Sequence, residues 1–438
     1  MEPASDDSLE TTIIGLTSAA LAASRRLALA PREQKDAALN RLAELIEASR
    51  EQLEAANQQD LEAGREAGLS QPLLDRLTFT PARVEAMVDG LRQVAALPDP
   101  VGAVLDTVSR PNGLVIRKVR VPIGVVGIIY ESRPNVTVDC AALCLKSGNA
   151  AVLRGGKEAF HSNTFLAELI QQALAETDLP EAAVQLIPTT DRAALNVLLK
   201  LDQFIHCLIP RGGEALIDFV AEHSRIPVIK HYKGVCSLYL DREADLDMAE
   251  AIVLNAKTQR VSVCNAVENL YVHKGIARDA LGRIGKKLSE AGVELRCLPS
   301  AARIFDQVNH AAILLADEEL EYEFAREGEL SEEYLDYKLT VKVVESAEEA
   351  IADINRFGSG HSDGIITANV ETAELFLNSV DAATVYWNAS TRFTDGYAFG
   401  LGAEIGISTD RLHARGPMGL NELCTYKYQI TGTGQIRE

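Results

Sequence analysis

The stretch Val121-Pro-Ile-Gly-Val-Val-Gly-Ile-Ile-Tyr-Glu-Ser-Arg-Pro-Asn-Val136 indicates the kind of fold that this chain adopts. Its apolar run, Ile123 to Ile129, is continuous rather than alternating, which is typical of a parallel strand buried on both faces. A polar turn follows, and residues 136–146 then have the composition of a helix that ends at Gly148-Asn149. This order of strand, turn and helix predicts the first part of an α/β domain.

The alternation of strands and helices continues along most of the chain. Apolar runs of strand length recur at residues 150–153, 184–187, 204–209, 227–229, 237–240, 270–273, 293–295, 339–344, 365–367 and 384–388. Such alternation predicts an α/β fold with two doubly wound parallel-sheet domains. We expect one domain over residues 1–102 and 122–230, beginning with Ala- and Leu-rich helices, and a second domain over residues 231–397.

Two segments differ from this alternation. Residues 103–121 carry apolar positions on both sides of the turn Pro111-Asn-Gly113, which is typical of a β-hairpin. The tail, Thr425 to Ile430, alternates like an edge strand. Because an exposed edge strand invites pairing with another chain, we expect residues 103–121 and 398–438 to form a small β oligomerisation element, and the protein to be a homo-oligomer.

The composition argues against several kinds of partner. The 438 residues carry a net charge of -20, which disfavours nucleic acid and anionic membrane surfaces. No apolar run reaches the length of about 18 residues that a membrane-spanning helix needs. The acidic start, residues 1–7, lacks the basic residues of a signal peptide. Seven Cys without a C-x-x-C pair favour the reducing cytoplasm, and they indicate no metal site.

The segment Asn255-Ala-Lys-Thr-Gln-Arg-Val-Ser-Val-Cys-Asn-Ala266 holds the strongest candidate nucleophile, Cys264. A thiolate attacks acyl carbonyls well, and Lys257 and Arg260, a few residues upstream, are candidates to stabilise it. The alternative is a small buried residue, which is what most cysteines are.

Two pairs of glycines, Gly155-Gly156 and Gly212-Gly213, each follow a predicted strand and precede a predicted helix. Without a Cβ, the backbone at such a turn can approach a ligand and present N–H groups at the positive end of a helix. Arg154, Lys157 and Arg211 add positive charge, so the turns indicate a cofactor that carries phosphate. The alternative is plain turn glycines beside solvated basic residues, since no Gly-x-Gly-x-x-Gly occurs at these turns.

Several motifs in order make the whole chain resemble the gamma-glutamyl phosphate reductase family, the proline-pathway branch of the aldehyde dehydrogenase superfamily. They are the two stretches quoted above, Leu153-Arg-Gly-Gly-Lys-Glu158, Ile209-Pro-Arg-Gly-Gly213, and Gly402-Ala-Glu-Ile-Gly-Ile-Ser408 with His413-Ala-Arg-Gly-Pro-Met-Gly419. The resemblance implies an aldehyde-dehydrogenase-like fold, in which residues 1–102 and 122–230 bind the cofactor and residues 231–397 form the catalytic domain.

The resemblance also implies an activity. It predicts NADPH-dependent reduction of L-glutamate 5-phosphate to L-glutamate 5-semialdehyde plus phosphate, the second step of proline biosynthesis from glutamate. Cys264 is then the nucleophile that attacks the acyl phosphate, and the thioester left after phosphate departs accepts hydride. Association with glutamate 5-kinase is a further expectation, because the acyl phosphate is labile.

Matched positions supply the residues expected around the cofactor and the reacting carbonyl. Asn135 corresponds to the Asn that holds the developing oxyanion, with a helix N-cap as its alternative role. Lys157 corresponds to the Lys beside the adenosine ribose and its phosphate. Arg211, Gly212 and Gly213 correspond to the turn that faces the dinucleotide, and Glu333 to an acidic ribose ligand.

Three arginines in the matched motifs are the candidates for binding the anionic groups of the substrate. They are Arg133, Arg260 and Arg415. A guanidinium binds carboxylate or phosphate through a planar fork of donors. For each of them the alternative is a structural ion pair.

The chain departs from the related patterns at two places. Hydrolysing aldehyde dehydrogenases carry, in a Glu-Leu-Gly-Gly stretch, the Glu that activates water, whereas the matched region here is Lys230-His-Tyr-Lys-Gly234. An enzyme that exchanges its acyl group with phosphate must avoid activating water, so the missing Glu favours an acyl-phosphate reductase. Val261-Ser262 stands where relatives carry Pro-Gly, which changes the backbone options of the Cys264 loop.

Two other functions stay open from the sequence. One is another acylating aldehyde dehydrogenase with a different leaving group, such as coenzyme A, and phosphate dependence of the reverse reaction separates it from the reductase. The other is a non-catalytic scaffold for glutamate 5-kinase, which would show no hydride transfer.

Overall fold

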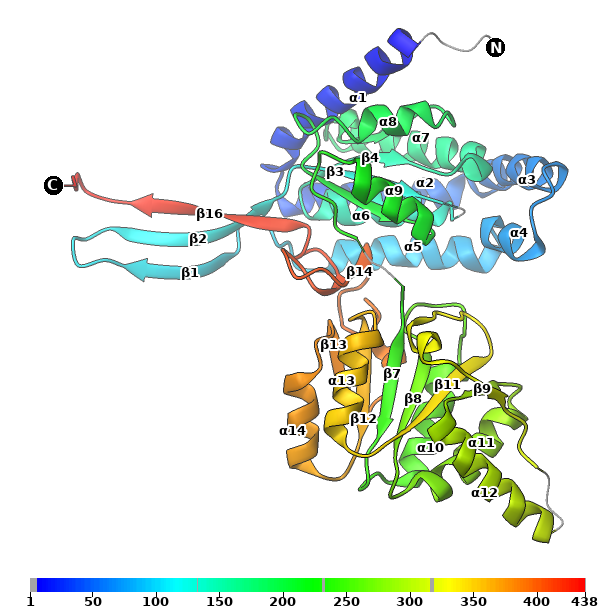
Figure 1. Cartoon of the computed structure of the whole chain (residues 1–438). Coiled ribbons are helices and arrows are strands. Elements are labelled where there is room, and N and C mark those ends of the chain that lie inside the picture. Colours follow the sequence, from blue (N-terminus) through cyan, green and yellow to red (C-terminus); the bar gives the residue numbers. More distant parts are fainter. Residues whose placement is uncertain (1–5, 132, 231–232, 316–318, 438) are drawn as a thin grey trace. The chain divides into compact units, whose positions relative to one another are not determined.

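The computed structural model describes residues 6–131, 133–230, 233–315 and 319–437, and the chain divides into two compact units (Figure 1). Unit 1 comprises residues 1–230, 400–406 and 418–438, and unit 2 comprises residues 231–399 and 407–417. Each unit has its own parallel sheet and its own hydrophobic core. The α/β fold predicted from the alternation of strands and helices is confirmed.

Unit 1 is built on a parallel sheet whose strands, in the described residues, follow the order β5-β4-β3-β6. These strands are β3 (Val125–Tyr130), β4 (Ala150–Arg154), β5 (Val184–Leu186) and β6 (Cys207–Arg211). All six residues of β3 are buried. The continuous apolar run therefore marks a central strand that is covered on both faces.

Helices cover both faces of this sheet. They are α1 (Asp6–Leu27), α2 (Arg32–Ala48), α3 (Arg50–Glu66), α4 (Gln71–Leu77), α5 (Pro81–Ala96), α6 (Asn135–Lys146), α7 (Phe160–Glu176), α8 (Ala193–Leu198) and α9 (Glu214–His223). One face, which includes Ile129, Val152 and Leu208, packs against α1, α8 and α9. Helices α6 and α7 lie on the opposite face, with α2, α3 and α5 packed outside them (Figure 1).

The prediction of one strand in unit 1 is wrong. Residues 227–229 were expected to begin a fifth strand, but they make a single parallel bridge between Val228 and Leu208. Leu208 donates its N–H to the carbonyl of Pro227 and accepts the N–H of Ile229, each at 2.8 Å. Pro227 has no N–H to extend this pairing, so the segment stops short of a strand.

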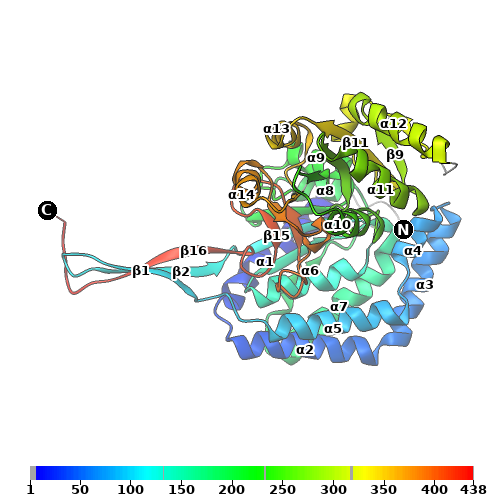
Figure 2. The same cartoon turned by 90° about the horizontal axis from the view of Figure 1, so that it is seen from below.

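A three-stranded antiparallel sheet extends from unit 1 as an arm, seen in Figure 1 and from below in Figure 2. It consists of β1 (Val104–Ser109), β2 (Val115–Pro122) and β16 (Cys424–Thr431), with β2 in the centre. Val108 pairs with Ile116 across the hairpin, and Tyr428 of the tail pairs with Lys118. The predicted hairpin and the predicted strand in the tail are both confirmed, and they belong to one sheet.

Unit 2 contains a second parallel sheet, whose described strands follow the order β10-β9-β11-β8-β7-β12-β13. The strands are β7 (Cys236–Leu240), β8 (Val267–His273), β9 (Glu294–Cys297), β10 (Glu323–Phe324), β11 (Lys338–Val344), β12 (Ser362–Ile366) and β13 (Thr384–Trp387). The helices are α10 (Leu246–Thr258), α11 (Ala277–Glu290), α12 (Pro299–Leu315), α13 (Ala347–Phe357) and α14 (Val370–Ser379).

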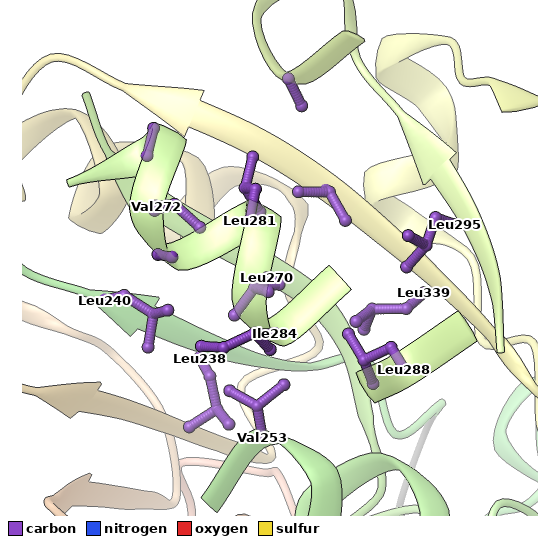
Figure 3. Packing of buried hydrophobic residues seen from close by; sticks show 14 of the residues in the cluster. Leu238, Leu240, Val253, Leu270, Val272, Leu281, Ile284, Leu288, Leu295 and Leu339 are labelled. Carbon is purple, nitrogen blue, oxygen red and sulfur yellow. The ribbon is translucent and has the colours of Figure 1, made fainter. Parts of the chain in front are cut away.

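The core of unit 2 lies on both faces of its sheet. Figure 3 shows the first face, where side chains of α10 and α11 pack onto β7, β8, β9 and β11. The labelled residues are Leu238, Leu240, Val253, Leu270, Val272, Leu281, Ile284, Leu288, Leu295 and Leu339. On the other face, Tyr239 and Tyr271 pack with side chains of α13 and α14. The alternation of side chains along each strand thus fills both cores.

Short elements complete the fold. Strands β14 (Gly406–Ser408) and β15 (Gly416–Met418) pair in a two-stranded sheet, at segments where the chain passes from one unit to the other. Single 3-10 turns are η1 (Lys157–Ala159), η2 (Glu181–Ala183), η3 (Glu327–Ser331) and η4 (Thr391–Phe393). None of the helices in the described part of the chain is long and apolar enough to cross a membrane.

Candidate active site

Cys264 lies in the turn that joins α10 to β8, at the amino end of β8. Helix α10 begins where the Asp245 carboxylate accepts the N–H groups of Asp247 and Met248, both at 2.9 Å. After the helix ends, the carbonyl of Val263 accepts the N–H of Ala266 at 3.1 Å and closes the turn. A capped helix and a buried strand therefore hold the two ends of the loop that presents the half-buried Cys264.

The other six cysteines have a different environment, because all of them are buried. Burial raises the pKa of each of these thiols; they are Cys140, Cys144, Cys207, Cys236, Cys297 and Cys424. A buried thiol with a raised pKa is a poor nucleophile at neutral pH. The alternative of a small buried residue, left open for Cys264 by the sequence, describes these six.

Gly234 lies directly against the backbone of Cys264. A Cβ added to Gly234 would overlap the carbonyl group and Cα of Cys264. The N–H of Gly234 donates to Glu333 Oε1 at 2.8 Å. This places Glu333 beside the nucleophile loop, within unit 2, and its expected contact with a ribose stays a prediction. His231 and Tyr232 belong to the same stretch, Lys230–Gly234, which differs from that of hydrolysing aldehyde dehydrogenases. They lie outside the described residues.

Lys257, expected to help a thiolate, is engaged elsewhere. Its ammonium pairs with Glu268 Oε2 at 2.6 Å, and both side chains are completely buried. Burial raises the pKa of Glu268 to about 7, although Lys257 opposes the shift. Glu268 Oε1 also accepts the N–H of Leu335 at 3.3 Å. The pair is thus a structural ion pair between α10 and β8, and it fixes the helix that leads to Cys264.

Arg392 is a residue near the nucleophile that the sequence did not single out. It belongs to η4, which is attached to Asn265, the residue after Cys264: Thr391 Oγ1 donates to the Asn265 carbonyl at 2.7 Å. Arg392 Nε donates to Gln259 Oε1 at 2.9 Å, next to the predicted ligand Arg260. Its only signal in the sequence is a single Arg in a polar loop, 127 residues from Asn265 along the chain.

Asn135 is the first residue of α6, in unit 1. The N-cap of this helix is Pro134, so Asn135 does not cap it. Asn135 Nδ2 instead donates to Asp139 Oδ2, one turn further, at 2.8 Å. Burial raises the pKa of Asp139 to about 6, while Asn135 and the nearby Arg211 oppose the shift. The carboxylate thereby fixes the orientation of the Asn135 amide.

The turn at Gly212-Gly213 differs from the expectation of an open anion site. Gly213 precedes α9, but its N–H donates to Glu131 Oε2 at 3.1 Å. A Cβ on Gly212 would meet the same carboxylate, so this glycine makes room for Glu131. A carboxylate repels phosphate and accepts bonds from hydroxyl groups. The turn thus presents a hydroxyl acceptor, the Glu131 carboxylate, beside the positively charged Arg211 at the end of β6.

The first glycine turn also lies beside a carboxylate, because a Cβ on Gly156 would meet the side chain of Glu158. Gly155 and Gly156 follow β4, and Lys157 begins η1 with an exposed side chain. A Cβ on Gly155 would meet the amide of Asn163, so this glycine is explained by packing. The exposed ammonium of Lys157 offers a charge for a phosphate group at the carboxyl edge of the parallel sheet, where ligands of such sheets bind.

Two further predicted substrate ligands lie in different units. Arg133 precedes α6 in unit 1 and is exposed, and its carbonyl accepts the N–H of Val136 at 3.0 Å. Arg415, in unit 2, donates to Asp381 Oδ1 at 2.7 Å and to the Asp381 carbonyl at 2.8 Å. Arg415 and Arg411 hold the pKa of Asp381 below its usual range. The contact of Arg415 matches the structural ion pair that was the alternative to substrate binding.

The two parallel sheets, and the half-buried thiol that precedes a central strand, are the features to compare with known proteins. The family model described as the aldehyde dehydrogenase family matches residues 7–298 and 339–424, which is most of the chain. Membership of this family indicates that the chain uses a nicotinamide cofactor.

Comparison with individual relatives identifies one family within the aldehyde dehydrogenases. A curated gamma-glutamyl phosphate reductase of Opitutus terrae is 60% identical, over 95% of this chain and 96% of the relative. One of Carboxydothermus hydrogenoformans is 52% identical, over 97% and 99%. The crystal structure of gamma-glutamyl phosphate reductase from Thermotoga maritima is 42% identical and matches with a TM-score of 0.92, over 97% of this chain and 100% of that one. The chain belongs to the gamma-glutamyl phosphate reductase family.

Proposed function

We propose that this protein reduces L-glutamate 5-phosphate to L-glutamate 5-semialdehyde and phosphate with NADPH, as the second step of proline biosynthesis from glutamate. The observation that carries the proposal is the half-buried Cys264, in a turn held between α10 and β8, in a chain of this family. Burial of the other six thiols supports Cys264 as the nucleophile.

The chemistry follows from the thiol. The Cys264 thiolate attacks the acyl carbon of the substrate, a C–S bond forms, and the C–O bond to phosphate breaks as phosphate leaves. The nicotinamide cofactor supplies the hydride that reduces the resulting thioester. The alkoxide of the thiohemiacetal then collapses, which releases the aldehyde and regenerates the thiolate. Asn135, oriented by Asp139, is the proposed donor to the oxyanion in both addition steps.

The cofactor is proposed to be NADPH rather than NADH. The exposed Lys157 supports this choice, because an ammonium near the adenosine ribose favours an additional phosphate. Gly213 and Glu131, at the next turn, support binding of a ribose. Arg133 and Arg260 remain the proposed ligands of the substrate, and Arg415 joins them by exchanging its pairing with Asp381 for the substrate. Glu333 remains a proposed ribose ligand.

The assembly and location are also proposals. Apolar side chains on the arm, including Tyr428 and Ile430, are exposed, and this supports a homo-oligomer. The cysteine pattern supports the cytoplasm. Association with glutamate 5-kinase is proposed only because the acyl phosphate is labile.

The test uses the reverse reaction. Purified protein receives glutamate 5-semialdehyde and NADP, with phosphate, with coenzyme A, or with neither, and NADPH formation is measured. We expect turnover with phosphate only, and its loss in Cys264→Ala but not in the buried control Cys424→Ala. Turnover with coenzyme A would favour another acylating dehydrogenase, and absent hydride transfer with verified NADP binding would favour the scaffold.

A further inference from the structure

The loop around η4 is attached firmly to the residue that follows the nucleophile. Thr391 Oγ1 donates to the Asn265 carbonyl at 2.7 Å, and Asn265 Nδ2 donates to the carbonyl of Thr394 at 2.8 Å and to that of Arg392 at 3.4 Å. Asn265, Thr391 and Thr394 are all buried. The backbone of Arg392 is therefore fixed relative to the backbone beside Cys264.

The guanidinium of Arg392 is directed by a second contact. Its Nε donates to Gln259 Oε1 at 2.9 Å, which brings it to the segment that ends in Arg260. Arg392 is half-buried, whereas Arg260 is exposed. Burial lowers the pKa of Arg392 and so does the neighbouring charge of Arg260, whereas Asp395 and Cys264 oppose these effects. By geometry, Arg392 is held between the residue that precedes Arg260 and the residue that follows Cys264.

Two arginines on neighbouring segments favour binding of an anion between them. Asp395 offsets part of the repulsion, and a doubly charged group between the two arginines would remove it. The planar fork of donors in each guanidinium matches the oxygens of a phosphoryl group. The group nearest to the carbon that Cys264 attacks is the phosphoryl group of the acyl phosphate, because it is bonded to that carbon through one oxygen.

We propose that Arg392, together with Arg260, binds the phosphoryl group of the substrate and stabilises the charge that develops on it as the C–O bond breaks. This rests on the proposed function and adds Arg392 as a residue that touches the leaving group. The same contacts bind inorganic phosphate in the reverse reaction. The α-carboxylate of the substrate is the other anion that a guanidinium could bind, and it lies at the far end of the substrate from the reacting carbon.

The experiment separates these two anions. In the reverse reaction, KM is measured separately for inorganic phosphate and for glutamate 5-semialdehyde, with wild type, Arg392→Gln, Arg392→Lys and the surface control Arg356→Gln. We expect Arg392→Gln to raise the KM for phosphate at least about tenfold, with the KM for semialdehyde changed by less than about twofold. Arg392→Lys keeps the charge but not the fork, so its effect should be intermediate.

A second measurement detects binding without turnover. Inorganic phosphate should slow alkylation of Cys264 by iodoacetamide in wild type and in Arg356→Gln, and this protection should be lost in Arg392→Gln. If Arg392→Gln does not fold, Arg392→Lys and Arg260→Gln decide the matter by the same two measurements. Each should raise the KM for phosphate at least about threefold and weaken the protection.

A larger KM for semialdehyde with an unchanged KM for phosphate would assign Arg392 to the carboxylate. Unchanged values for both would remove it from the site. If wild type itself shows no dependence on phosphate, the proposed function fails, and the inference fails with it.

Discussion

At the scale of single residues, the surroundings of Cys264 separate it from the other cysteines. It lies in a turn between a helix and a strand, whereas the other six thiols are buried. Two neighbours shape this position: Gly234, which leaves room for the Cys264 backbone, and Asn265, which ties the loop to η4. Substitutions near the nucleophile should therefore affect activity through backbone position.

Replacing Gly234 tests the close approach. In Gly234→Ala, the Cβ would overlap the backbone of Cys264, so the loop has to move. We expect kcat/KM to fall about a hundredfold or more, because a shift of about 1 Å in a reacting group has such an effect. Gly328→Ala is the matched control, since a Cβ there meets nothing within 4 Å. Near-normal kinetics in Gly234→Ala, with circular dichroism unchanged, would disprove the packing argument.

Asp363 provides a pH-dependent prediction. Burial raises the pKa of this carboxyl from its ordinary value of 3.8 to about 7, although Asp363 accepts the N–H of Ser237 at 2.8 Å. The folded state therefore binds more protons than the unfolded state between these two values. The contribution of Asp363 to stability is accordingly favourable at low pH and falls as the pH rises through that window.

Asp363→Asn removes this titration but keeps an oxygen for the Ser237 N–H. The thermal midpoint of the variant, relative to wild type, should therefore rise by at least about 3 °C between about pH 5 and about pH 8. Scanning calorimetry at both pH values measures it, with the exposed Asp279→Asn as control. If the thermal midpoint of the variant minus that of wild type stays constant or falls as the pH rises, burial does not raise the pKa of Asp363.

At the scale of elements, much of the fold follows from local patterns. Continuous apolar runs predicted β3 and β4 because both are buried between layers of helices. The predicted strand at residues 227–229 is only a bridge, because Pro227 cannot extend the pairing and periodicity does not show where a strand loses its neighbour. The turn Pro111-Asn-Gly113 predicted the hairpin of β1 and β2. The sequence did not predict that β2 also pairs with β16, which lies far along the chain.

The candidate site was predicted less completely than the fold. Cys264 could be singled out because a thiol has distinctive chemistry, and its exposure agrees with that choice. Arg392 was missed because its place beside Asn265 depends on contacts between distant segments. The Glu131 carboxylate at Gly213 was also missed, since turn glycines indicate a close approach but do not reveal which group approaches.

In the first turn of α6, the Asn135 amide is held by the Asp139 carboxylate. Asp139 fixes the amide of Asn135 one helical turn away, so Asp139→Ala should leave the amide free to rotate. We expect kcat to fall about tenfold in Asp139→Ala and about a hundredfold in Asn135→Ala, with the KM for NADPH little changed. Asp218→Ala, on α9, is the control. A normal kcat in Asp139→Ala beside a strong effect of Asn135→Ala would exclude the positioning role.

For the whole molecule, the exposed arm is the feature that favours association with a second copy of the chain. Tyr428 is 59% exposed and Ile430 is 60% exposed, although both lie in a regular strand, β16, at the edge of its sheet. Apolar side chains on an edge strand favour pairing with a second copy. The sheet order β1-β2-β16 leaves β16 with a ladder partner on one side only, in the described residues.

Charges placed on this strand test the proposed assembly. The double variant Tyr428→Lys, Ile430→Lys should lower the mass measured by light scattering to that of a smaller species, because lysines on an edge strand oppose pairing. Leu29→Lys, at another exposed apolar residue of unit 1, should leave the mass unchanged. A wild-type protein that is already monomeric, or a double variant of unchanged mass, would refute a role of the arm in assembly.

A first-turnover experiment follows NADPH formation with enzyme, NADP and glutamate 5-semialdehyde but no phosphate. If Cys264 carries the acyl group and only phosphate removes it, about one NADPH per active site should form in a burst. Turnover should then stop until phosphate is added, and Cys264→Ala should show no burst. Steady NADPH formation without phosphate, or a burst in Cys264→Ala, would show that Cys264 does not carry an acyl group that only phosphate removes.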